Sequence, residues 1–208
     1  MNSYLDKQIR VLFGKSFSEM SEEEKMQITE ITLPYKNFNG ELTGALMSEL
    51  SQFPALKKCL ISGFELNDDD LEILNQIATL RGIQFSGCDF SEVTEALCDL
   101  EVVVIDNCGN IPKRLLQNNS SLRLFRAVNQ SYFDVGNLLG CNALEEAYLQ
   151  RSTLVNLLSL KMLKSLKLVN LSGSRMNFIA LTHLRKLKDL TVEYNKEAEK
   201  SGIPDFSR

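Results

Sequence analysis

The chain has 208 residues, of which 44% are hydrophobic and 24% charged, so it can bury a core and is not disordered as a whole. Lys and Arg number 23 against 27 Asp and Glu, a net charge of −4, and without a dense basic cluster we expect no nucleic-acid partner. No apolar run approaches the roughly 18 residues of a membrane span, so we expect no membrane partner either.

Residues 1–27 predict a helical segment that caps the rest of the chain. Ser21 and Glu24 fit the S-x-x-E capping box, which satisfies two free backbone N–H groups at a helix start. The first part of this segment carries Asp6 among its basic residues and has no uninterrupted apolar stretch, so it lacks the layout of a secretory signal. We therefore expect a cytoplasmic protein whose five cysteines are reduced thiols.

An apolar pattern, L-x-x-L-x-L, recurs through residues 28–195. Its first position is occupied in turn by Ile28, Leu56, Leu80, Leu100, Leu122, Leu144, Leu163 and Leu187. Successive copies lie 19 to 28 residues apart, within or close to the spacing of about 20–29 residues that one strand and its return segment need. The second and third positions are apolar in all eight copies, and this alternation predicts short strands with one buried face.

The segments between the predicted strands carry helix signals, and we expect an α/β fold. Residues 68–74 begin with three aspartates, which favour a helix start, residues 91–97 have a similar acidic start, and Pro112 suits the first turn of a helix over residues 111–116. A fourth core residue is expected in several copies, at Phe38, Leu66, Phe90, Tyr132 and Leu154.

These residues resemble the leucine-rich-repeat family from Ile28 to about Tyr194. The resemblance implies a right-handed solenoid of about eight repeats, with a parallel β-sheet on the concave face and short helices on the convex face. The segments Ile9–Lys15, Met20–Glu24 and Ile28–Leu33 resemble the N-terminal helical cap of bacterial, internalin-like members. We expect one continuous domain, with the cap over 1–27, the repeats over 28–195 and a tail or weak cap over 196–208.

The family usually has Asn at the ninth motif position, where its side chain bonds the backbone of the turn. Cys88 and Cys108 are accepted variants there, whereas Phe64 and Gln130 are not, so the resemblance implies turns that differ between repeats.

No set of residues predicts catalysis, a metal site or a cofactor. His183 is the one histidine and falls in a predicted return segment, where a surface or packing role is the favoured interpretation. Cys108 is interpreted as a turn residue facing the core, and no C-x-x-C pair suggests zinc. Gly14-Lys15-Ser16 lacks the first glycine of a phosphate loop. We therefore expect a protein that is not an enzyme and holds no metal.

Side chains between the core positions of each strand point away from the core, so the pattern also predicts the exposed face. Apolar residues cross the middle of that face with charged residues among them, as at sites where proteins bind partners. The candidate partner-binding residues are Val104, Asp106, Leu124, Arg126, Val128, Glu146, Tyr148, Arg151, Lys167 and Tyr194.

Two other interpretations of this face remain open. β-branched residues suit strands without any binding role, and Val102 and Val104 are equally compatible with a strand that is buried on both faces.

We expect a module that binds another protein through the concave face and acts by occupancy, as an inhibitor, an immunity-type protein or a scaffold. The alternatives are a structural protein that self-associates as a homodimer and, less favoured, an enzyme with an unrecognised site.

Overall fold

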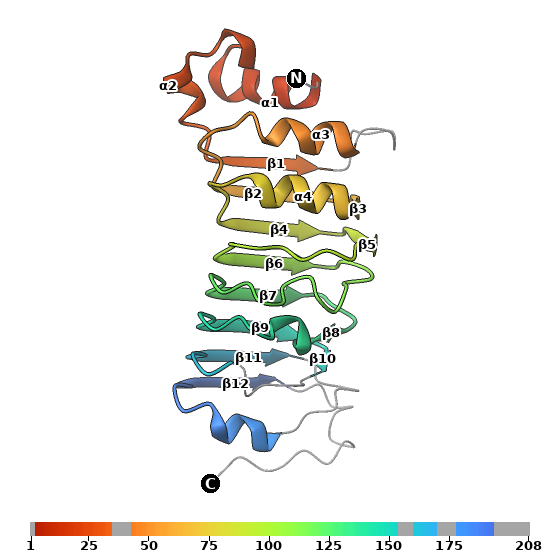
Figure 1. Cartoon of the computed structure of the whole chain (residues 1–208), viewed down its shortest axis with the longest axis vertical. Helices are drawn as coiled ribbons and strands as arrows, with labels where there is room; N and C mark the ends of the chain where they lie inside the picture. Colours follow the sequence, from red (N-terminus) through yellow and green to blue (C-terminus); the bar gives the residue numbers. More distant parts are fainter. Residues whose placement is uncertain (1–2, 35–42, 154–159, 170–177, 194–208) are drawn as a thin grey trace.

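The computed structural model describes residues 3–34, 43–153, 160–169 and 178–193. The fold is α/β, and its main feature is one parallel sheet in which eight strands lie in chain order along the long axis of the molecule (Figure 1). The strands are β1 (Glu30–Pro34), β2 (Lys58–Ser62), β4 (Gly82–Ser86), β6 (Val102–Asp106), β7 (Leu124–Val128), β9 (Glu146–Gln150), β11 (Ser165–Val169) and β12 (Asp189–Glu193).

All eight strands have five residues and pair without a register shift. Glu30 lies opposite Lys58, Lys58 opposite Gly82 and Gly82 opposite Val102, and this alignment continues to the last strand. These pairings confirm the strand positions and the register predicted from the apolar pattern in every copy. The register matters because a slip of one residue would turn each core side chain to the other face.

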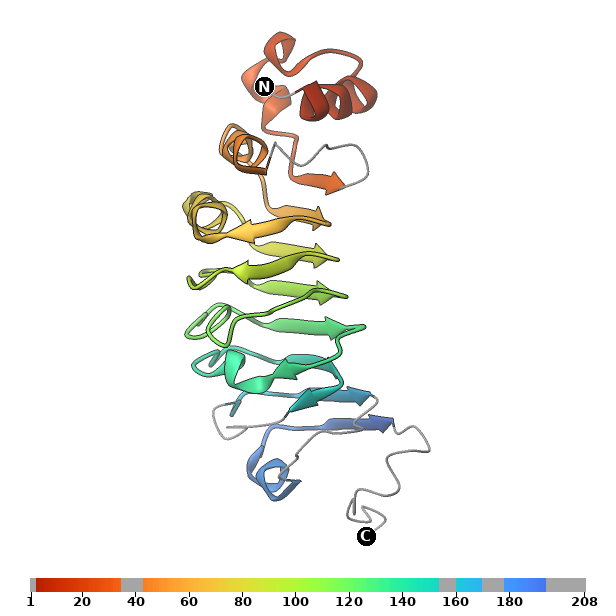
Figure 2. The same ribbon diagram turned by 90° about the vertical axis from the view of Figure 1, so that its right-hand side faces the viewer.

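One face of the sheet is covered by the connecting segments, which lie together on the same side of the strands (Figure 2). Leu33, Ile61, Phe85 and Ile105 point into the layer between them and are fully buried. Aromatic rings extend this layer, since Phe125 and Phe133 have ring centroids 4.8 Å apart. Burial of such side chains contributes about 1.5–3 kcal/mol each and is the main force that stacks one strand on the next.

The connecting segments change character along the chain. The first two contain α3 (Thr43–Leu50) and α4 (Asp68–Gln76), whereas later ones contain 3₁₀ turns, η3 (Val135–Leu138) and η5 (Phe178–His183). Short strands pair parallel on this side, β3 (Glu65–Asn67) with β5 (Asp89–Glu92) and β8 (Phe133–Asp134) with β10 (Ser152–Thr153). Short helices on this side are therefore present, but not in every connection.

The helix predicted over residues 68–74 is confirmed, and the two predicted over 91–97 and 111–116 are wrong. In the former segment residues 91–92 are the end of β5 and residues 93–97 follow an irregular path, and the latter segment forms turns. The cause is chain length. Successive main-sheet strands start 28 and 24 residues apart around α3 and α4, but only 20 and 22 residues apart where the helices are missing. A helix advances about 1.5 Å per residue against about 3.3 Å for extended chain, so a short connection spans the same distance only when it is extended.

Two predicted core residues are wrong. Tyr132 is 56% exposed, and the neighbouring Phe133 is buried in its place because β8 aligns one residue later. Leu190 is 39% exposed because β12 is the last strand of the sheet and has a neighbouring strand on one side only. Leu66 and Phe90 are buried as predicted, and Phe38 and Leu154 lie outside the described residues.

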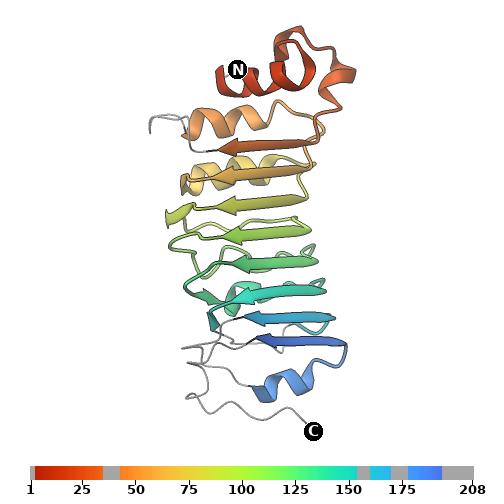
Figure 3. The ribbon, with the colours of Figure 1, turned by 180° about the vertical axis from the view of Figure 1, so that it is seen from behind.

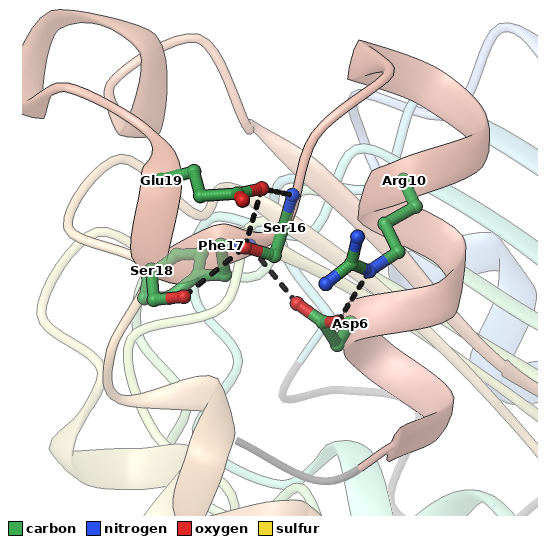
Figure 4. Close-up of polar contacts among 6 residues, drawn as sticks. All are labelled: Asp6, Arg10, Ser16, Phe17, Ser18 and Glu19. Atoms are coloured by element: carbon green, nitrogen blue, oxygen red, sulfur yellow. Dashed lines mark hydrogen bonds and ion pairs between the residues drawn. The ribbon is translucent and has the colours of Figure 1, made fainter.

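The N-terminal segment is helical as predicted, with α1 (Ser3–Phe13), η1 (Phe17–Glu19) and α2 (Glu22–Lys25) packed at the β1 end of the sheet. Figure 4 shows its polar contacts: Asp6 accepts from the Arg10 guanidinium at 2.8 Å and from the Phe17 backbone N–H at 3.0 Å, and Glu19 accepts from the Ser16 N–H at 2.7 Å. The capping box of α2 is confirmed, since Glu24 accepts from the N–H of Ser21 and donates its own N–H to the Ser21 hydroxyl.

Candidate interface on the outer sheet face

The second face of the sheet, here named the outer sheet face, is turned toward the viewer in Figure 3. It carries the side chains between the core positions, because side chains alternate along each strand. Val104, Leu124 and Val128 are half-buried there, and Val102 is 38% exposed. The interpretation of β6 as a strand buried on both faces is therefore wrong. Neighbouring strands partly cover these apolar side chains, and the remainder faces outward as an apolar row across β6 and β7, in which Arg126 lies opposite Val104 and Asp106 opposite Val128.

Tyr148 and Lys167 form the centre of the polar part of this face. They are cross-strand neighbours, and the Lys167 ammonium lies 5.5 Å from the centre of the Tyr148 ring and 2.7 Å from a Glu193 carboxylate oxygen. The hydrogen bond to Glu193 is the main reason that the pKa of Lys167 is raised. Arg126 lies opposite Tyr148 on the other side and is exposed. An aromatic ring thus packs against one cation and has a second cation on the neighbouring strand, and Tyr and Arg commonly anchor a partner.

Each of five successive main-sheet strands, from β2 to β9, is followed by one residue in the left-handed conformation. These residues are Gly63, Gly87, Asn107, Asn129 and Arg151, with φ between 50° and 71°. The conformation turns the backbone N–H toward the next strand, as when the N–H of Gly87 donates to the Asp106 carbonyl at 2.8 Å. Gly and Asn tolerate this region, whereas Arg151 is a strained choice.

In the turns after β6 and β7, side chains donate hydrogen bonds to the carbonyls at the strand ends. Cys108 donates its thiol to the carbonyl of Asp106 at 3.4 Å, and the buried Gln130 donates to the carbonyl of Val128 at 3.1 Å. The ninth motif position therefore bonds the strand end in both turns, although its chemistry differs between them.

Most of the predicted site residues share the outer sheet face, but they do not form a single cluster. Tyr148, Lys167 and Arg126 meet in the central column. Asp106 lies at the strand end and accepts a hydrogen bond from the Asn129 amide at 2.7 Å, so it is committed to the turn. Glu146 lies at the opposite strand end, and Arg151 lies in the turn beyond β9 rather than on a strand. Tyr194 lies outside the described residues.

The structure adds a hollow of about 460 Å³ over β2, β4 and β6 that the sequence interpretation missed. Gly82 has no side chain, so a gap opens between Lys58 and Val102, with Leu60 and Val104 beside it. The single glycine in a column of larger residues was the signal that could have revealed it.

Other reactive groups are placed apart from this face. His183 is exposed at the end of η5. Burial raises the pKa of the Cys59 thiol to about 12 and that of Cys141 to about 11, and the contact of Cys108 with Cys88, together with burial, raises the pKa of Cys108. Among the described residues, no three His, Cys, Asp or Glu side chains are grouped to hold a metal ion.

A membrane-crossing helix is not found in the described ranges, because none of their helices combines sufficient length with sufficient apolar character.

Comparison with known proteins leaves the chain without a family assignment by similarity. No protein-family profile matches it. No curated protein sequence matches it at a significant level either.

Proposed function

We propose that the chain is a leucine-rich-repeat solenoid of the bacterial, internalin-like type, and that it binds a partner protein through the outer sheet face. The apolar pattern over residues 28–195 and eight parallel strands in chain order support the solenoid. Successive left-handed turn residues support it as well, because a repeat returns the chain to the same conformation each time. In such a solenoid the outer sheet face is concave, and residues 1–27 cap the open end of the core.

The observation that carries the binding proposal is the half-buried ring of Tyr148, which lies under the Lys167 ammonium and opposite the exposed Arg126, beside the apolar row of β6 and β7. Strands need alternating residues to stack, but they need no aromatic ring flanked by cations on the solvent side. A rigid aromatic group with apolar and charged neighbours is typical of the residues that dominate binding energy at protein interfaces.

The proposed mode of action is occupancy in the cytoplasm, without catalysis: the chain blocks, holds or bridges its partner. An inhibitor, an immunity-type protein and a scaffold all act in this way. The raised pKa values of the buried Cys59 and Cys141 thiols and the exposed position of His183, which is bonded to no described nucleophile, support a non-enzymatic role.

A pull-down from a lysate of the producing cells tests the proposal. The wild type is compared with the Arg126→Glu/Tyr148→Glu double variant and with Arg114→Glu/Tyr132→Glu, which makes the same changes at exposed positions of the connecting segments. We expect a protein that the wild type and the control variant retain and the first variant loses by at least tenfold, after all three are shown to elute as the same species. Equal retention of that protein by the wild type and both variants would show that the binding site does not lie on this face.

Self-association through the same face is the second candidate function, and the exposed Val102 beside Leu124 favours it. A molecular mass that doubles with concentration in the wild type, but not in the Arg126→Glu/Tyr148→Glu variant, would assign the face to a homodimer.

A further inference from the structure

The hollow over β2, β4 and β6 combines a largely apolar floor with a basic rim. Leu60 and Val104 are half-buried at its base with Gln84 between them, whose amide donates to the Ser86 hydroxyl at 3.2 Å. Val102 forms one wall, while Gly82 contributes only backbone. Its volume of about 460 Å³ is in the usual range for sites that receive a compact group. The backbone N–H of Gly82 already donates to the Lys57 carbonyl at 2.9 Å, so the floor has no unpaired donor there that would call for a polar ligand.

The charges around the hollow are unequal. Lys57, Lys58 and Arg81 border it, and Glu101 is the one carboxylate among its lining residues. Glu101 lies 3.8 Å from the Arg81 guanidinium, which leaves two ammonium groups in excess. Within the described ranges neither Lys57 nor Lys58 has a carboxylate at ion-pair distance, even though Glu30 is the cross-strand neighbour of Lys58. Half-exposed cations without a partner are free to accept a negative charge from another molecule.

We propose that this hollow is a specificity subsite for an acidic protein segment, in which one aromatic or branched aliphatic side chain of the partner inserts over Gly82 and adjacent carboxylates pair with Lys57 and Lys58. The subsite rests on the proposed partner-binding function and adds to it the chemistry of the bound segment. The apolar floor selects the inserted side chain, and the rim selects its neighbours, because a lysine or arginine at those positions would face two like charges.

Leu60 and Val104 of the hollow lie in the same column of outward side chains as Tyr148, toward the β1 end of the same face. One partner segment that runs across the strands would therefore contact both places. Tyr148 with Arg126 would act as the first anchor, and the hollow would act as the second.

The test uses the full-length chain labelled with ¹⁵N and titrated with three short peptides as probes: acetyl-Asp-Phe-Asp-amide, acetyl-Lys-Phe-Lys-amide and acetyl-Asp-Ala-Asp-amide. We expect saturable shifts of the backbone amides of Leu60, Gly82 and Val102 with the first peptide, with a dissociation constant on the order of 1 mM. The other two peptides should bind at least tenfold more weakly, since each lacks one of the two features.

Two variants test separately how the floor and the rim of the hollow contribute to peptide binding. Gly82→Val fills the hollow, and its new Cβ would meet the Lys58 side chain at 3.5 Å and the Val102 side chain at 3.9 Å, which are ordinary contacts. This variant should lose the saturable shifts. Lys57→Glu/Lys58→Glu changes only exposed positions and should reverse the preference toward acetyl-Lys-Phe-Lys-amide.

Each outcome decides the proposal. Absence of saturable shifts at these three amides, equal binding of all three peptides, or unchanged preference in the double variant would overturn it. A wild type that is dimeric and becomes monomeric on Gly82→Val would assign the hollow to a second copy and likewise overturn it. Peptide binding at the hollow together with a pull-down that retains no partner would instead count against the proposed function and leave the subsite standing.

Discussion

At the scale of single residues, the turn after each strand controls how the chain passes from one strand to its connection. Gly63 and Gly87 hold φ values of 71° and 62° there, a region that a side chain with a Cβ disfavours. By contrast, Gly82 has an ordinary extended φ and lies in a strand. Glycine thus permits a left-handed backbone at Gly63 and Gly87, whereas at Gly82 it leaves open space beside the strand.

Replacing Gly87 by Ala should lower the free energy of unfolding by about 1 kcal/mol, because the left-handed conformation penalises a Cβ even though no atom lies within 4 Å of it. Urea denaturation measures the change. Gly82→Ala is the matched control and should cause no loss, since its backbone is compatible with alanine. Similar losses in both variants would show that the left-handed turn is not the cause.

The sequence predicted the residues of the outer sheet face because alternation along a strand assigns every second side chain to one side. Tyr148 and Lys167 were therefore placed correctly as neighbours. The hollow at Gly82 was missed, since it arises from a missing side chain between Lys58 and Val102 on the neighbouring strands and leaves no pattern along one strand. The role of Asp106 in its turn depends on Asn129 from the next strand, a pairing that only the folded chain defines.

At the scale of elements, α4 shows how a helix start is fixed by reciprocal bonds. Asn67 accepts from the Asp70 N–H at 3.0 Å, and Asp70 accepts from the Asn67 N–H at 3.2 Å. Asp70 is fully buried, and its second carboxylate oxygen has no hydrogen-bond partner within the described ranges. Burial raises the pKa of this carboxyl above its ordinary value of 3.8.

Asp70→Asn tests the consequence for stability. A raised pKa means that the folded chain holds the proton more tightly than the unfolded chain, so the Asp70 contribution is most favourable at low pH and is lost as pH rises through the raised pKa. The variant should therefore gain stability relative to wild type between about pH 3 and pH 7, by about 1 kcal/mol at the upper end. Urea midpoints measured across this range provide the check, and a constant difference between the two proteins would refute the assignment.

The N-terminal helical segment is joined to the main core through Phe17, which is buried and has its ring centroid 5.0 Å from that of Phe53. Phe17→Ala should cost about 3 kcal/mol, since it removes an aromatic group and leaves a cavity. Val11→Ala, at a position that is 79% exposed, should change stability by less than about 0.5 kcal/mol. Thermal unfolding monitored by circular dichroism compares the two, and a small effect at Phe17 would mean that the segment does not cap the core.

Elements were predicted unequally well from the sequence. A strand is predicted from two apolar residues at fixed spacing. Leu149 therefore helped to locate β9, and Leu168 helped to locate β11, without information from the rest of the chain. Helix signals in the connections were local, whereas the path of a connection depends on the distance it must span. The segment over residues 91–97 carries acidic helix-start residues but lacks the chain length that allows α4 in the connection before it.

At the scale of the whole molecule, the parallel sheet joins the outward side chains of neighbouring strands into one extended surface. Each strand contributes three outward side chains, and the shared register brings those of neighbouring strands into columns. The hollow at Gly82, the apolar row of β6 and β7 and the Tyr148 cluster follow one another along these columns. A surface of this kind fits a partner that lies across several strands, which is how an occupancy mechanism would obtain both area and specificity.

Photo-crosslinking inside the producing cells tests whether a partner protein binds at the outer sheet face. The amino acid p-benzoylphenylalanine replaces Tyr148 in one variant and the exposed Tyr132 of a connecting segment in another. We predict that irradiation joins the Tyr148 variant to one other protein, and that the Tyr132 variant gives no such product. Products of equal yield from both positions, no product from Tyr148, or a product with twice the mass of the chain would contradict the binding of a distinct partner at the outer sheet face.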